Sequence, residues 1–129
     1  MYELTIEQHF HAAHTIVGHP GKCARPHGHT YIVRVTIAGE QLDSLGMLVD
    51  FSYIRGEVSR ILDELDHADL NELPAFGPGR NPTAEMIARY VFYALRDRLE
   101  FPGVAQPPTF RVARVEIQEG PGSVAAYYE

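Results

Sequence analysis

Residues 23–37 read CARPHGHTYIVRVTI, and this stretch joins a turn-rich start to a regular alternation of side chains. Across residues 31–37 every second side chain is apolar, which is typical of a β-strand with one buried face. Residues 2–10 alternate in the same way, and the proline- and glycine-rich residues 18–26 lie between the two segments. We therefore predict two strands that pair with each other.

The middle of the chain shows helical spacing instead. Apolar side chains recur at helical intervals across residues 54–65, and either Asp50 or Ser52 is placed to cap the start of this helix. A second apolar stripe covers residues 86–95, with Thr83 as a candidate N-cap. We predict two helices here.

Two more strands are predicted near the C-terminus. The proline-rich residues 102–108 break the second helix, and residues 110–119 and 124–128 then flank a Gly-Pro-Gly turn. The order is therefore ββααββ. It predicts an α+β fold in which a four-stranded antiparallel sheet carries both helices on one face. Such a sheet has two exposed edges, and because the chain is too short to cover them itself, we expect it to form oligomers.

Size, charge and cysteine content narrow the class of protein. The 129 residues fit a single domain, 1–129, and the net charge of -6 provides no basic surface for nucleic acid. Cys23 is the only cysteine, so a disulfide within the chain is excluded and a reducing compartment is favoured. No segment approaches the roughly 18 apolar residues of a membrane span. We expect a cytoplasmic protein with a small-molecule ligand, and neither a nucleic acid nor a membrane as its partner.

Three histidines are candidates for a metal site. His27 and His29 flank Gly28 at the start of the second strand, and positions i and i+2 of a strand point to the same side. His14 ends the first strand, so pairing of the two strands can bring it beside them. Three imidazoles with an open fourth position are the usual arrangement of a catalytic zinc ion, and we predict Zn²⁺.

Several histidines have a simpler explanation. Seven occur in the chain, and histidines in loops are often merely solvated. His9 and His11 alternate out of phase with the buried side of the first strand, and His19 lies in the turn-rich segment. We expect these three to be solvated.

Cys23 lies between Lys22 and Arg25, four residues before His27. Nearby cations and a metal ion favour the thiolate over the thiol, so this side chain is a candidate base or nucleophile. The alternative is that Cys23 is a small buried apolar residue, as lone cysteines usually are.

Two acidic positions are also candidates. Asp66 and His67 follow the first helix, where a carboxylate can orient and charge an imidazole; alternatively, His67 only interacts with the helix dipole. Glu119 ends a strand beside a glycine turn. It can accept two hydrogen bonds from an amidine-like N–H pair, or it is simply a solvated residue at the end of a strand.

Together these features resemble the 6-pyruvoyltetrahydropterin synthase family, including its bacterial 6-carboxytetrahydropterin synthase branch. The resemblance runs almost from end to end. It is based on six motifs in order: FHAAH (residues 10–14), CARPHGH (23–29), VDF (49–51), LDHADLN (65–71), NPTAE (81–85) and QE (118–119).

The resemblance assigns roles to the candidate residues. It implies that zinc is bound by His14, His27 and His29, that Cys23 is the catalytic base, and that Asp66 and His67 form the proton-transfer pair. Glu119 resembles the residue that anchors the 2-amino and N3 edge of the pterin, and Thr83 resembles the threonine near the same ring. Lys22 and Arg25 are local candidates to hold a triphosphate, with no motif behind them.

The same resemblance implies a fold, a substrate and an assembly. The fold is the tunnelling fold, whose trimers close a barrel and stack into hexamers, with sites between subunits. The substrate is 7,8-dihydroneopterin triphosphate. Three residues separate Cys23 from His27, a spacing that resembles the branch that forms 6-carboxytetrahydropterin, acetaldehyde and triphosphate for queuosine biosynthesis.

Two features depart from this pattern or lie outside it. Gly120 stands where family members often have threonine after the glutamate, and residues 75–80 form a loop to which no role is carried over. Two alternatives stay open: a 6-pyruvoyltetrahydropterin synthase with the same zinc site, and a noncatalytic module that binds pterin or zinc. A zinc hydrolase is disfavoured, because the chain has no HExxH helix.

Overall fold

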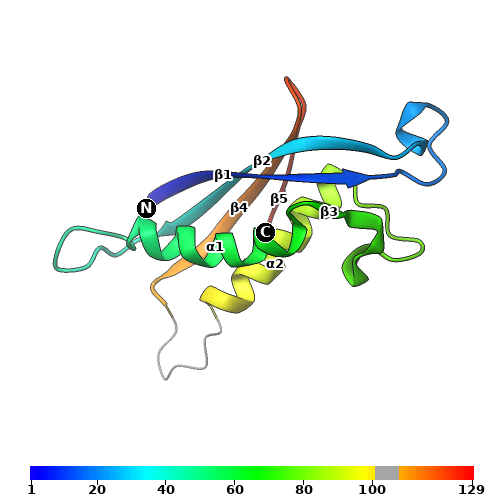
Figure 1. The fold of residues 1–129 in the computed structure, drawn as a ribbon. Coiled ribbons are helices and arrows are strands. Elements are labelled where there is room, and N and C mark those ends of the chain that lie inside the picture. Colours follow the sequence, from blue (N-terminus) through cyan, green and yellow to red (C-terminus); the bar gives the residue numbers. More distant parts are fainter. Residues whose placement is uncertain (101–107) are drawn as a thin grey trace.

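The computed structural model describes residues 1–100 and 108–129 (Figure 1). Most of the helix break predicted at residues 102–108 therefore lies outside the described residues. The long elements follow the predicted order ββααββ. They are β1 (Tyr2–His14), β2 (His27–Gly39), α1 (Phe51–Leu65), α2 (Ala84–Leu99), β4 (Phe110–Glu119) and β5 (Val124–Tyr128), with the short strand β3 (Ala68–Asp69) after α1 and 3-10 turns at Lys22–Ala24, Leu70–Glu72 and Pro74–Phe76.

The sheet of the described residues has five strands, in the order β3-β1-β2-β4-β5, so the prediction of four strands was wrong. The additional strand, β3, pairs with β1 in parallel, through Ala12 with Ala68 and Ala13 with Asp69. The sheet is consequently mixed rather than wholly antiparallel. A strand of two residues shows no alternation, so periodicity gave no signal for it.

Both α-helices cover one face of the sheet, as predicted (Figure 1). The alternating residues of β2 that the sequence marked as apolar, from Tyr31 to Ile37, are at most 1% exposed and pack against the helices. Asp50, rather than Ser52, caps α1 by accepting a hydrogen bond from the Ser52 N–H at 2.7 Å. Thr83 caps α2 by accepting one from the Met86 N–H at 3.2 Å. Each cap is worth about 1 kcal/mol.

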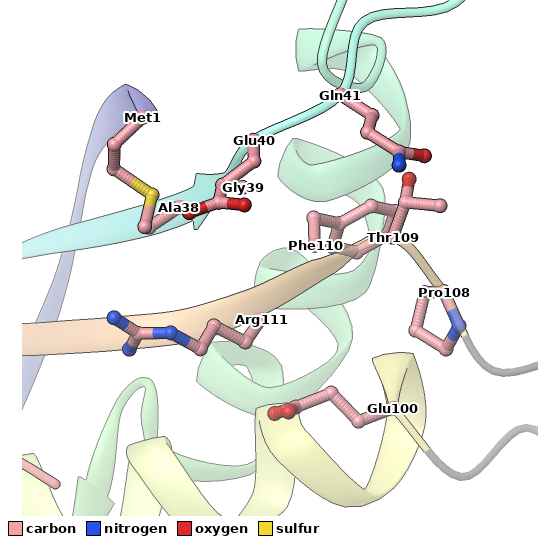
Figure 2. A pocket seen from close by; sticks show the side chains of 10 residues that line it. All are labelled: Met1, Ala38, Gly39, Glu40, Gln41, Glu100, Pro108, Thr109, Phe110 and Arg111. Atoms are coloured by element: carbon pink, nitrogen blue, oxygen red, sulfur yellow. The ribbon is translucent and has the colours of Figure 1, made fainter.

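The two ends of the β1–β2 ladder differ in chemistry. At the end where Tyr2 pairs with Gly39, a hollow of about 470 Å³ is lined by backbone and mixed side chains, including Glu40, Glu100 and Arg111 (Figure 2). Burial raises the pKa of Glu100 there. The candidate histidines lie at the opposite end, so this hollow is not part of their site.

Neither α1 nor α2 has the length and apolar character that a membrane crossing requires.

Candidate functional site

The pairing of β1 with β2 brings the candidate histidines together, and the pairing of β2 with β4 adds Glu119. β1 and β2 pair without interruption from Tyr2 and Gly39 to His14 and His27. His29 lies two residues further along β2, on the same side as His27. Tyr31 pairs with Glu119 of β4, which places that carboxylate on the helix-covered side as well. The convergence of His14, His27 and His29 predicted from the strand pairing is therefore present.

The four side chains form a compact set of metal-ligating atoms. One ligand atom from each of His14, His27, His29 and Glu119 lies within 4.8 Å of the others. Glu119 Oε1 is 2.9 Å from His14 Nε2 and 2.8 Å from His29 Nε2. The sequence did not predict that Glu119 joins the histidines, because its position depends on the pairing of β2 with β4.

Hydrogen bonds at the other ring nitrogens fix the tautomers of two histidines. His14 Nδ1 donates to the Pro82 carbonyl and His27 Nδ1 donates to the Arg25 carbonyl, each at 2.7 Å. A carbonyl oxygen only accepts, so Nδ1 carries the proton and Nε2 keeps its lone pair in the neutral ring. Outer contacts of this kind orient histidines that bind metals.

In the part of the chain that the structure describes, the Nε2 atoms of His14 and His29 lack hydrogen-bond donors. Within the described residues, neither His14 Nε2 nor His29 Nε2 has a hydrogen-bond partner with suitable geometry, although the Glu119 carboxylate lies beside both. Burial lowers the pKa of His29, although the nearby Glu119 carboxylate acts in the opposite direction. The net lowering of the pKa favours the neutral imidazole. The lone pairs of His14 Nε2 and His29 Nε2 lie beside the Glu119 carboxylate with no proton between them. A bound cation would stabilise this arrangement. The donor set of three imidazoles and one carboxylate fits zinc.

Tyr31 packs against this cluster, although the sequence predicted it only as a core residue. Its ring stacks on Phe10 with centroids 4.8 Å apart and meets the His29 ring edge-on at 5.4 Å. The side chain is fully buried, and its hydroxyl has no partner among the described residues. Burial, with a smaller effect of Glu119, raises the pKa of Tyr31, so the hydroxyl keeps its proton.

Asp66 and His67 form the pair that their adjacency suggested. His67 Nδ1 donates to Asp66 Oδ2 at 2.9 Å, and Asp66 Oδ1 accepts from the His11 N–H at 2.9 Å. The His11 and His67 hydrogen bonds lower the pKa of Asp66, and the carboxylate stays charged. His67 also donates its own N–H to the His11 carbonyl. The pair is thus tied to the edge of β1.

The backbone of His67 is unusual. Its φ of 58° lies in the left-handed region, and no other non-glycine among the described residues has a positive φ. This conformation costs about 1–3 kcal/mol and persists only where neighbouring contacts impose it. The His67 side chain is 77% exposed. An exposed imidazole on a strained backbone, with a carboxylate on its ring, is a candidate for proton transfer.

The pair and the histidine cluster are not bonded to each other. His11 lies on the side of β1 opposite His14, which agrees with its predicted phase, and both His9 and His11 are exposed. No hydrogen bond or ion pair among the described residues joins Asp66 or His67 to the cluster. A hollow of about 590 Å³ nevertheless has both His29 and His67 in its lining.

Cys23 lies in the 3-10 turn between β1 and β2 and is partly exposed. Its thiol is not part of the metal-ligating set, so its assigned role stays a prediction. Neither Lys22 nor Arg25 makes an ion pair within the described part of the chain, and their link to a triphosphate is likewise untested. The Thr83 hydroxyl is engaged as the cap of α2.

Comparison with known proteins identifies the family. A sequence model described as 6-pyruvoyl tetrahydropterin synthase matches residues 3–129. The chain is 35% identical to a 6-carboxy-5,6,7,8-tetrahydropterin synthase of Bacillus subtilis, over 98% of this chain and 84% of that protein. A protein of the same name from Haemophilus influenzae is 31% identical, with complete coverage of both. The solved structure of Caenorhabditis elegans 6-pyruvoyl tetrahydropterin synthase superposes with a TM-score of 0.78 at 28% identity, covering 100% of this chain and 97% of that one. The chain belongs to the 6-pyruvoyl tetrahydropterin synthase family.

Proposed function

We propose that this protein is a zinc-dependent 6-carboxytetrahydropterin synthase. It converts 7,8-dihydroneopterin triphosphate to 6-carboxytetrahydropterin, with release of acetaldehyde and triphosphate, in the queuosine pathway of the cytoplasm. The observation that carries the proposal is the convergence of His14, His27 and His29, two of them with Nδ1 fixed by a carbonyl. The choice of the carboxy-forming branch is supported by the names of the relatives from Bacillus subtilis and Haemophilus influenzae and by the three residues between Cys23 and His27.

In this proposal the three histidines hold the zinc ion. Their neutral Nε2 atoms are the donors, and the Pro82 and Arg25 carbonyls keep two of the rings in the required tautomer. When bound, zinc would supply Lewis-acid polarisation of the side-chain oxygens of the substrate. Glu119 anchors the pterin through its 2-amino and N3 edge, and Thr83 lies near the same ring.

Proton transfers are divided between two groups of this chain. Cys23 removes a proton from a side-chain carbon of the substrate, and His67 returns one. Asp66 holds the His67 ring by its Nδ1, so Nε2 is the atom that delivers the proton. The strained backbone of His67 supports this assignment, since strain of this kind is concentrated at functional sites. Lys22 and Arg25 hold the triphosphate.

The proposed assembly is a hexamer, a dimer of trimers, with active sites between subunits. Two observations support it: β5 is an edge strand of the sheet, and among the described residues Asp66 and His67 make no bond to the histidine cluster. A second subunit can provide the proton-transfer pair that each metal centre requires. Association of subunits is one way in which an edge strand is covered.

The test is mass analysis of the products. Purified protein loaded with zinc is incubated with 7,8-dihydroneopterin triphosphate, and 6-carboxytetrahydropterin, 6-pyruvoyltetrahydropterin and acetaldehyde are measured together. Carboxytetrahydropterin with acetaldehyde is the expected result. The pyruvoyl product would instead support the activity named for the Caenorhabditis elegans neighbour. Binding of zinc and pterin without any product would indicate a noncatalytic module.

A further inference from the structure

The two asparagines of the chain, Asn71 and Asn81, bind the segment that directly follows His14. Asn71 accepts a hydrogen bond from the Thr15 N–H at 2.8 Å and donates one to the Thr15 carbonyl at 2.8 Å. Asn81 does the same with Val17, at 3.0 Å and 2.9 Å. Each amide therefore occupies both polar groups of one backbone residue, which only a side chain with both a donor and an acceptor can do.

The same segment also contacts Cys23. Thr15 and Val17 direct their polar groups to the asparagines, and the residue between them, Ile16, donates its N–H to the Cys23 carbonyl at 2.7 Å. Residues 15 and 16 lie outside the strands and residue 17 begins a turn, so these hydrogen bonds are what hold the segment in place. Residues 15–17 thus form a strip that is bonded both to the two asparagines and to Cys23.

The asparagines are themselves attached to the candidate metal centre and to the sheet. Asn81 directly precedes Pro82, whose carbonyl accepts from His14 Nδ1 at 2.7 Å. The Asn71 N–H donates to Asp69 Oδ1 at 3.1 Å, and Asp69 is part of β3, which pairs with β1. The strip is therefore held against the same elements that hold His14.

We propose that Asn71 and Asn81 are positioning residues that set the place of Cys23 relative to the three histidines. The inference deepens the proposed function, on which it rests for the role of Cys23. The turn-rich loop between β1 and β2 has only short 3-10 structure of its own, so its distance from the metal centre depends on such attachments. A displacement of about 1 Å in a reacting group can cost about a hundredfold in rate.

The experiment compares Asn81→Ala with a matched control, Asp43→Ala, in the full-length protein. Asp43 Oδ1 accepts two backbone hydrogen bonds, from Leu45 and Met47 at 2.9 Å each, in the loop between β2 and α1. Both variants thus remove two side-chain contacts to a loop, but only one loop carries Cys23. Zinc per chain, kcat, KM and the alkylation rate of Cys23 by iodoacetamide are measured, the last both with and without zinc.

We expect Asn81→Ala to keep its zinc and its KM within about threefold, while kcat falls at least tenfold and the alkylation rate changes at least tenfold; this expectation follows from the cost of displacing a reacting group. Asp43→Ala should match the wild type in all four. Unchanged kcat and alkylation in Asn81→Ala, or equal changes in the control, would overturn the proposal. If Asn81→Ala does not fold, Asn81→Asp is read in the same way, because it keeps the acceptor for the Val17 N–H but replaces the donor with a carboxylate oxygen that faces the Val17 carbonyl.

Failure of the proposed function gives a different pattern. A wild-type protein that makes no product leaves alkylation as the deciding measurement. Altered Cys23 reactivity in Asn81→Ala but not in Asp43→Ala would then still support the positioning role, and unaltered reactivity would overturn it.

Discussion

Glu119 has two candidate tasks at the level of a single residue. Its carboxylate touches His14 and His29, as a metal ligand would, while the family resemblance assigns it to the pterin ring. The two tasks differ in what the protein loses when the charge is removed. A ligand contributes to metal affinity, whereas an anchor contributes to substrate affinity.

We predict that Glu119→Gln keeps its zinc and raises KM at least tenfold. The physical reason is that a hydrogen bond to a charged group is worth about 1.5–3 kcal/mol, and the amide replaces one of the two acceptors with a donor. Metal analysis and steady-state kinetics check this outcome. His27→Ala serves as the control, because loss of a ligand should remove the metal. Loss of zinc from Glu119→Gln would instead identify Glu119 as a ligand.

The residues of the site differ in how well the sequence predicts them. The three histidines were predictable, because HxH spacing on a strand and a third histidine at the end of the neighbouring strand are local patterns. Glu119 was not placed beside them, since the β2–β4 register joins residues far apart in the chain. Tyr31 looked like any alternating core residue. The left-handed backbone of His67 has no sequence signal, because it is imposed by contacts with His11.

At the scale of elements, the junction between α1 and β3 depends on the charge of Asp66. Its carboxylate receives hydrogen bonds from the backbone of β1 and from His67, and these lower its pKa. A group whose pKa is lowered on folding adds stability above its ordinary value, and this stability is lost as the pH falls through the folded value.

We therefore predict a pH-dependent effect of Asp66→Asn. The stabilisation by the Asp66 carboxylate should be present above the ordinary aspartate range, and the difference in free energy of unfolding between wild type and variant should shrink as the pH falls below about 4. Urea denaturation of the metal-free protein across pH 3–7 measures it. Asp63→Asn in the same helix, whose carboxylate makes no hydrogen bond within the described residues, is the control. A difference that does not vary with pH would refute the assignment.

The elements themselves were mostly predictable. Each of β1, β2, α1 and α2 buries one face, so apolar residues recur in its own sequence with the period of a strand or a helix. The capping residues Asp50 and Thr83 were candidates for the same local reason. The prediction of four strands failed at β3, because two residues pair with β1 only through the placement of α1 and carry no periodic pattern of their own.

At the scale of the whole molecule, His67 and His29 border one hollow, but the proton-transfer pair and the histidine cluster are not bonded to each other among the described residues. Asp66 and His67 are tied to the edge of β1, and no bond in the described residues joins them to the histidine cluster. The outer strand β5 has one neighbour and exposes Val124 and Tyr128. Association of copies can cover this edge, and the proposed assembly would bring Asp66 and His67 of one subunit to the histidine cluster of another.

Mixing inactive variants tests whether the halves belong to different subunits. Cys23→Ala and His67→Ala should each lack turnover, because each removes one proposed proton carrier. Unfolding and refolding them together should restore part of the activity, since mixed assemblies contain some sites with both residues intact. Product formation after mixing, with mass measurement of the assembly, checks this. No recovery from verified mixed assemblies would place Cys23 and His67 in the same subunit's site.

The uninterrupted β1–β2 ladder has a consequence for how this sequence can change during evolution. The pairing of Tyr2 with Gly39 continues to His14 and His27 without a bulge. Because neighbouring residues of a strand face opposite sides, deletion or insertion of one residue within either strand would turn one partner away from the histidine cluster. A change in the length of the connection between the strands leaves this phase intact. The spacing between Cys23 and the HGH motif can therefore change more readily than the length of either strand between the histidines and the register that pairs them.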